Sequence, residues 1–125
     1  MNKRILIISN DMPLALGLYS GLCQEGTAEI QIDYEPNGTL AYSSIKDTEP
    51  DLLVVDIETP GLSASWVSLQ LEGTTIKDEI PTVGISRLLN NEEREILTDL
   101  TGVQIHPGNV SLTDLKKNIM TTLVQ

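Results

Sequence analysis

The sequence predicts an α/β fold: a doubly wound, five-stranded parallel sheet with helices on both faces, arranged as a three-layer sandwich. Short apolar runs typical of buried strands alternate along the chain with stretches that are apolar at helical spacing. Units of this kind place their strands in one parallel sheet, because the crossovers between them are right-handed. The 125 residues, 1–125, are expected to form one domain, long enough to bury a core without disulfides or metals.

The first half of the chain is predicted to form three strands and two helices. Pro13 suits the first position of a helix, where its missing N–H would have no partner in any case. Leu18 and Leu22 follow at helical spacing, and Glu25-Gly26 ends the helix. The second strand alternates in polarity like an edge strand. The predicted strands are residues 5–9, 30–34 and 52–55, and the second helix covers about 38–47.

The second half is predicted to form two strands and three helices. Asn90 or Asn91 caps the middle helix, which has acids in its first turn and ends at Gly102. Ser111, three residues before Asp114, resembles a capping box that opens the last helix, although Asp replaces the usual Glu. The predicted strands are 82–86 and 103–106, a short helix is predicted at 65–72, and the last helix turns Leu112, Leu115, Ile119 and Leu123 inward.

Asp56 occupies the most informative position of the chain. Residues 52–55, Leu-Leu-Val-Val, form an unbroken apolar run typical of a parallel strand covered on both faces, and Pro60-Gly61 turns the chain soon afterwards. The carboxylate is therefore expected at the carboxyl end of a central strand, the edge at which ligands bind in open α/β sheets. An acid that only caps a strand end is the simpler alternative.

Five segments of the chain form an ordered set of motifs: Arg4-Ile-Leu-Ile-Ile-Ser-Asn-Asp11, Asn37-Gly-Thr-Leu-Ala41, Pro50-Asp51, Asp56-x-x-x-Pro60-Gly61 and Ile80-Pro-Thr-Val-Gly-Ile-Ser86. In order and spacing they resemble the motifs of response-regulator receiver domains. The resemblance covers essentially the whole chain and implies a flavodoxin-like sheet with strand order 2-1-3-4-5. It also implies that Asp56 is the phosphoacceptor and that Ser86 is the hydroxyl that binds the phosphoryl group.

The function implied by the resemblance is that of a receiver domain in two-component signalling. A sensor histidine kinase or a phosphotransfer protein would supply the phosphoryl group, and the output would be a changed protein-binding face, with an effector domain or a homodimer as its target. The alternative is a pseudo-receiver of the same fold that acts without phosphorylation. A dedicated enzyme is not expected, because no nucleophile–base pair is visible beyond the Asp56 site. A flavodoxin-like cofactor protein would need a Ser/Thr/Gly-rich phosphate loop, which residues 9–13 do not form.

The resemblance implies a Mg²⁺ site built from two acids after the first strand, the phosphoacceptor and the backbone carbonyl of Glu58. If Pro13 sets the register, Asn10 and Asp11 take the two acid positions, and this is the register we prefer; if the strand end sets it, Ser9 and Asn10 take them. At least one acid is neutral in either case, so weak Mg²⁺ binding is expected. Asp11 could instead serve only as an acid at a helix N-terminus.

A second departure from the family concerns the lysine that precedes a proline after the fifth strand. The segment 104–110 contains no lysine, and either His106 or Gly108 takes that place, depending on the alignment. The nearest evident cation is Arg87, directly after Ser86. Three roles are open to its guanidinium: it pairs with Asp56, it holds a phosphoryl group bidentately, or it extends into solvent.

Composition limits the partners and the location. No apolar run approaches membrane-spanning length and no signal-peptide core is present, so a cytoplasmic protein is expected. Cys23 is the only cysteine, which excludes an internal disulfide, and its apolar helical surroundings predict a buried packing thiol. The net charge of −10 disfavours binding to anionic lipids and to nucleic acids.

We expect no appreciable binding of duplex DNA by this domain. A chain with a net charge of −10 offers no basic stripe from which counterions of the phosphate backbone could be displaced. A gel-shift titration at low salt should show no complex, and a complex that weakens as salt is added would contradict this expectation.

Overall fold

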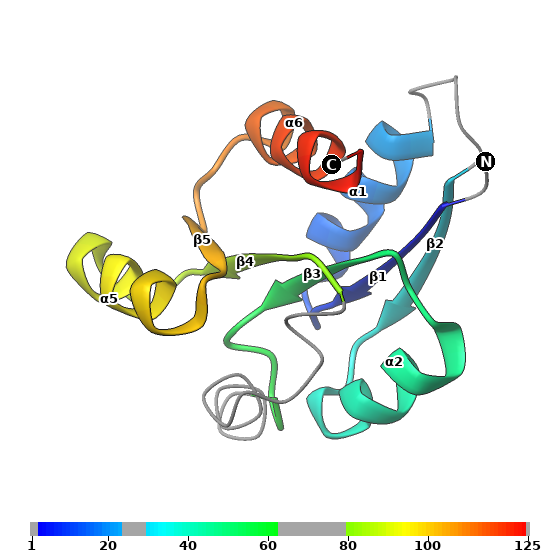
Figure 1. Cartoon of the computed structure of the whole chain (residues 1–125), viewed down its shortest axis with the longest axis horizontal. Coiled ribbons are helices and arrows are strands. Elements are labelled where there is room, and N and C mark those ends of the chain that lie inside the picture. The colour runs from blue at the N-terminus through cyan, green and yellow to red at the C-terminus, as the bar shows by residue number, and fades with distance from the viewer. Residues whose placement is uncertain (1–2, 24–29, 63–79, 125) are drawn as a thin grey trace.

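The computed structural model contains one five-stranded parallel sheet in the order β2-β1-β3-β4-β5 (Figure 1). It describes residues 3–23, 30–62 and 80–124. The fold class and strand order predicted from the sequence are confirmed, and the short helix predicted at 65–72 lies outside the described residues. The elements are β1 (Lys3–Ile8), α1 (Met12–Cys23), β2 (Ile30–Glu35), the 3-10 helix η1 (Gly38–Leu40), α2 (Ala41–Thr48), β3 (Leu52–Asp56), β4 (Thr82–Ser86), α5 (Asn91–Thr101), β5 (Gln104–Pro107) and α6 (Leu112–Leu123).

Two separate cores lie on the two faces of the sheet. Alternate residues of β1 and β3 point to opposite faces, so Ile5 and Leu52 belong to one core and Leu6 and Leu53 to the other. The first core also contains the apolar faces of α1 and α6, and the second contains those of α2 and, at its margin, α5. Figure 1 shows the same layering, with α1 and α6 on one side of the sheet and α2 on the other.

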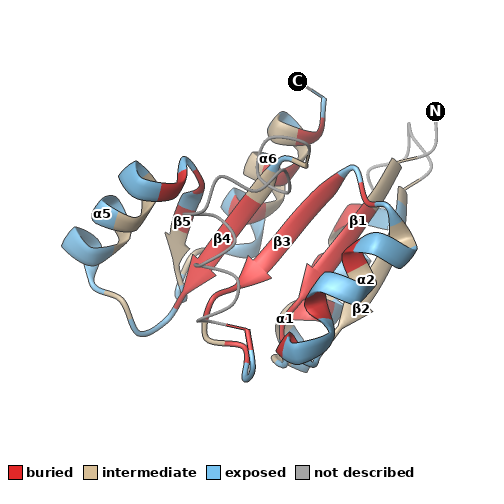
Figure 2. Ribbon diagram, turned by 60° about the horizontal axis from the view of Figure 1, so that its bottom comes forward, coloured by how far each residue is buried: buried red, intermediate tan, exposed pale blue. Residues whose placement is uncertain are grey.

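Burial on both faces explains the apolar runs of the sequence. All five residues of β3 are buried, and β1 is buried from Ile5 to Ile8, whereas the edge strand β2 is half-buried for most of its length (Figure 2). A central parallel strand therefore reads as a continuous apolar segment and an edge strand as an alternating one. Among the described residues, no helix has both the length and the apolar character needed to cross a membrane.

The two ends of α5 and the start of α6 agree with their predicted signals, whereas the helix end predicted at Glu25-Gly26 lies outside the described residues. Asn90 accepts a hydrogen bond from the backbone N–H of Glu93, whose carboxylate accepts one from the N–H of Asn90, and together they form a complete capping box. Gly102 ends α5 at φ 74°, a left-handed conformation that glycine adopts without a steric cost. Ser111 caps α6 by accepting from the N–H of Asp114 at 3.1 Å. Leu115, Ile119 and Leu123 of this helix are buried as predicted, but the prediction of an inward Leu112 is wrong, because its side chain is 47% exposed in the first turn.

The prediction of a buried Cys23 is wrong, because the side chain is exposed. The inward positions of α1 are Ala15, Leu18 and Leu22, which lie three and four residues apart on one face of the helix. Cys23 follows Leu22 directly, and one helical step of about 100° turns it away from that face. Apolar neighbours in the sequence therefore did not imply a shared face.

The loop after β3 is held against the chain after β2. The N–H of Gly38 donates to the carbonyl of Pro60 at 3.0 Å. A Cβ at Gly38 would lie 2.5 Å from that carbonyl oxygen and would also overlap the backbone nitrogen of Leu62. Gly61, at φ 86°, faces the side chain of Thr39 in the same way. Two motifs that are separate in the sequence thus support one loop, the loop that follows Asp56.

The substitution Gly38→Ala should lower the free energy of unfolding by about 2–3 kcal/mol, because the added methyl group can be accommodated only if the backbone moves. Urea unfolding followed by circular dichroism measures this change. Gly21→Ala is the matched control, since its methyl group would meet only Lys116 Cδ at 3.5 Å. Equal stability of the two variants would contradict the close packing described for Gly38.

Candidate functional site

Asp56 ends β3 and carries a buried carboxylate, with 1% of the residue exposed. Its Oδ1 accepts a hydrogen bond from the backbone N–H of Glu58 at 3.2 Å, and its Oδ2 accepts one from Ser9 Oγ at 3.0 Å. Burial raises the pKa of Asp56 above its ordinary value of 3.8, an effect that outweighs the opposing hydrogen bond from Ser9 and the charge of Arg87. The site is therefore built around a charge that is costly to bury.

Ser9 is a member of the site that the preferred sequence register left out. Ile8 of β1 pairs with Val55 of β3, so the next residues along the two parallel strands, Ser9 and Asp56, lie side by side. The Ser9 hydroxyl also accepts a hydrogen bond from the N–H of Asp11 at 3.0 Å, which fixes the start of the following loop. Extending the two strands residue by residue would have found this pair in the sequence, had their register been known.

Asp11 and Asn10 have different environments. Asp11 Oδ1 accepts from the N–H of Leu14 at 3.1 Å, in the manner of a helix cap, while its Oδ2 lies 3.6 Å from the guanidinium of Arg87. Asn10 is exposed and takes no part in the contacts that the structure describes around Asp56. The side chains that flank the acid from β1 are thus Ser9 and Asp11, with Asn10 between them turned outward.

Arg87 is the cation of the site. Its guanidinium lies 3.5 Å from Asp56 Oδ2 and 3.6 Å from Asp11 Oδ2, so one side chain joins both carboxylates. The arginine side chain is 48% exposed and the Asp56 side chain only 1%, so the guanidinium covers the acid from the solvent side. Of the three roles open to Arg87 in the sequence, this structure shows pairing with Asp56.

Ser86 ends β4 and is fully buried, but its hydroxyl is engaged by another residue. It donates to Glu58 Oε2 at 2.6 Å and accepts from the N–H of Leu89 at 3.1 Å. The other carboxylate oxygen of Glu58 accepts from the backbone N–H of Arg87 at 2.6 Å. The Glu58 side chain therefore ties the loop after β3 to the end of β4, a role that the sequence did not suggest, because no local pattern links position 58 to positions 86 and 87.

The donor set around Asp56 does not fit Mg²⁺ in this arrangement. A hard divalent cation needs several oxygen ligands that are free to turn toward it. Here Asp11 and Asp56 share one guanidinium, and the carboxylate of Glu58 is bound to Ser86 and to the N–H of Arg87. Within residues 3–23, 30–62 and 80–124, no group of three or more His, Cys, Asp or Glu side chains could hold a metal ion.

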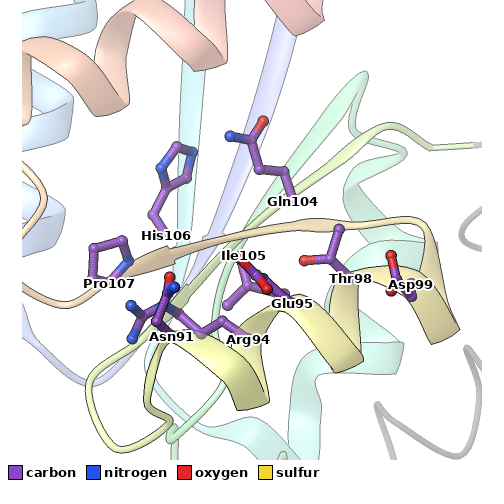
Figure 3. A pocket seen from close by; sticks show the side chains of 9 residues that line it. All are labelled: Asn91, Arg94, Glu95, Thr98, Asp99, Gln104, Ile105, His106 and Pro107. Carbon is purple, nitrogen blue, oxygen red and sulfur yellow. The ribbon is translucent and has the colours of Figure 1, made fainter.

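Two cavities lie beside α5 and β5. One, of about 450 Å³, lies between α5 and β5 and is lined mainly by polar side chains (Figure 3). In Figure 3, His106 and Gln104 project from the side of β5 opposite to Arg94, and His106 Nε2 lies 2.9 Å from Asn118 Oδ1 of α6. His106 is therefore directed to α6 and does not stand in for the missing lysine. The second cavity, of about 380 Å³, is lined by Ser86, Arg87, Arg94, Pro107, Gly108 and Asn109.

Comparison with known proteins identifies the fold. No family model matches the sequence, and no curated protein sequence is similar to it. A response regulator from Desulfuromonas acetoxidans has a TM-score of 0.78 at 22% identity, over 98% of this chain and 97% of that chain. The BeF3-activated N-terminal receiver domain of RstA from Klebsiella pneumoniae has a TM-score of 0.77 at 20% identity, over 98% and 99% of the two chains.

A third solved structure, the signal receiver domain of the DNA-binding response regulator merR from Colwellia psychrerythraea, has a TM-score of 0.78 at 18% identity, over 98% of this chain and 99% of that chain. In all three comparisons the match covers nearly the full length of both chains. The chain therefore has the fold of response-regulator receiver domains, as the sequence motifs predicted.

Replacement of the buried acid by Asp56→Asn should raise the free energy of unfolding by about 1 kcal/mol at pH 7, because an amide is cheaper to bury than a carboxylate. The folded protein keeps Asp56 protonated to a higher pH than the unfolded chain does. The contribution of Asp56 to the free energy of unfolding is therefore lost as the pH rises through its folded pKa. The gain should vanish below the ordinary pKa of 3.8 that Asp56 has in the unfolded chain.

Urea unfolding at a series of pH values measures this difference. The exposed Asp47→Asn, which removes the same charge, should not show the same pH dependence. A less stable Asp56→Asn protein at pH 7 would mean that the pair with Arg87 outweighs the cost of desolvation.

Proposed function

We propose that this chain is a receiver domain of two-component signalling that accepts a phosphoryl group on Asp56. The observation that carries the proposal is the position of this one acid: it ends the central strand β3 and faces Ser9, directly after β1, and Arg87, directly after β4. The receiver fold adds support, since chemistry in such sheets collects at the carboxyl ends of the strands. The domain acts as an acceptor and binding module rather than as a dedicated enzyme.

The acceptor oxygen in this proposal is Asp56 Oδ1. Oδ2 is engaged by Ser9 Oγ and by the guanidinium of Arg87, whereas Oδ1 accepts only the longer backbone bond from Glu58, at 3.2 Å. Oδ1 attacks the phosphorus of a phosphohistidine on a sensor kinase or phosphotransfer protein. A P–O bond forms, the P–N bond breaks, and the released imidazole takes a proton from solvent. Arg87 then has a phosphoryl oxygen to bind in place of the neutralised carboxylate.

Access to Asp56 requires a movement of the residues that cover it. Arg87 is the exposed member of the ion pair and has the freedom to swing outward, while Asp56 is fixed in the sheet. Ser86 would bind the phosphoryl group only after it leaves Glu58, to which it now donates at 2.6 Å. Phosphorylation would thus break two contacts between the loop after β3 and the end of β4, and the protein-binding face would change as these contacts rearrange. An effector domain or a second copy of the chain is the proposed target.

A second candidate function, that of a pseudo-receiver, is favoured by the closed state of the pocket. Asp56 is 1% exposed and is paired with Arg87. The segment 104–110 contains no lysine that could bind a phosphoryl group. A module that is never phosphorylated would keep this arrangement permanently and present one constant surface to its partner. In both functions Mg²⁺ binding is weak, because the ion competes with Arg87.

Intact mass spectrometry after incubation with a small acyl phosphate distinguishes the two functions. The receiver proposal predicts the addition of one phosphoryl group that hydroxylamine removes, and its loss in Asp56→Asn. Asp51→Asn is the matched control, since this exposed acid ends no strand of the site and accepts a hydrogen bond from the N–H of Arg4. Absence of an adduct in both the unmodified chain and Arg87→Ala, in which the cover is removed, would support the pseudo-receiver instead.

A further inference from the structure

We infer that Arg87 is the resident cation of the Asp56 pocket in place of a divalent metal, and that Gly108 is the residue that positions it. The inference rests on the proposed function only for the role of Asp56. It concerns how the charge of the pocket is balanced, which is a property of the resting protein and does not require that phosphorylation takes place.

The space around Gly108 is filled by the side chain of Arg87. A Cβ built on this glycine would overlap Arg87 Cγ, would lie 2.9 Å from Arg87 Cβ and would lie 3.1 Å from its Cα. The stem of the arginine therefore occupies the volume that any side chain at position 108 would need. Gly108 has no left-handed backbone that demands glycine. The close approach of Arg87 is the physical reason for a glycine at this position.

This packing imposes a direction on the side chain of Arg87. The backbone N–H of Arg87 is held by Glu58 Oε1 at 2.6 Å, and the stem is held against Gly108. Because the backbone and the first carbons of the Arg87 side chain are held in this way, the guanidinium reaches Asp11 Oδ2 at 3.6 Å and Asp56 Oδ2 at 3.5 Å. Arg94, the other arginine of the adjoining cavity, instead donates to the carbonyl of Leu89.

The contact of Arg87 with the two acids affects the binding of metal ions. A guanidinium stays protonated at any physiological pH, so one unit of positive charge faces the two carboxylates at all times and independently of the supply of metal. A divalent cation that enters the pocket must displace Arg87 and would experience its positive charge at close range. Replacement of Arg87, or a side chain at position 108 that takes up its volume, should therefore make Asp11 and Asp56 a better site for a divalent cation.

The test is a titration with Mg²⁺, followed by NMR of backbone amides, on the full chain without any phosphodonor. Arg87→Ala should raise the affinity for Mg²⁺ by about tenfold or more, because a unit positive charge beside the ion is lost. Gly108→Ala should raise it as well, since the new methyl group displaces the arginine. The double variant should bind no more tightly than Arg87→Ala, because both changes act through the same side chain.

Two controls separate this effect from a general loosening of the fold. Arg94→Ala removes a cation from the adjoining cavity that has no ion pair with the acids, and it should leave the affinity unchanged. Asp11→Asn in the Arg87→Ala background should abolish the gain. An unchanged Mg²⁺ affinity in Arg87→Ala would overturn the role of the arginine. Additive effects of Gly108→Ala and Arg87→Ala would overturn the role of the glycine. A failure of phosphorylation would overturn only the proposed function.

Discussion

The desolvated carboxylate of Asp56 is the constraint around which the rest of the site is arranged. A buried negative charge persists only when donors and a counter-charge surround it. These groups come from three parts of the chain: a hydroxyl from the end of β1, a backbone N–H from the loop after β3, and the guanidinium that follows β4. They meet because parallel strands with the observed register end at one edge. The strand order is therefore as necessary to the site as any of its side chains.

The fold could be predicted from the sequence because its signals are local. Apolar runs, helical spacing and the capping residues Asn90 and Gly102 each act within a few positions of the chain. The position of Asp56 at a strand end followed from the same kind of signal. Cys23 was misplaced because it adjoins the buried Leu22, and a helix changes face with every residue.

The contacts of the site were less predictable, because they depend on distances between strands and loops that the sequence does not specify. The choice between Ser9 and Asp11 depended on the register, and the structure brings both to the pocket and turns Asn10 outward. The Glu58 side chain finds its partners across the gap between two loops. Glu58 thus joins the loop that follows Asp56 to the residues that follow β4 through two hydrogen bonds.

The close approach of Gly108 to Arg87 also couples the substitutions that these two positions tolerate. Any side chain at position 108 would overlap Arg87 Cγ and would lie 2.9 Å from Arg87 Cβ. A shorter residue at position 87 removes the first contact and leaves the second, so it relieves only part of the crowding. The two positions therefore form an epistatic pair, in which the cost of a side chain at position 108 depends on the residue at position 87.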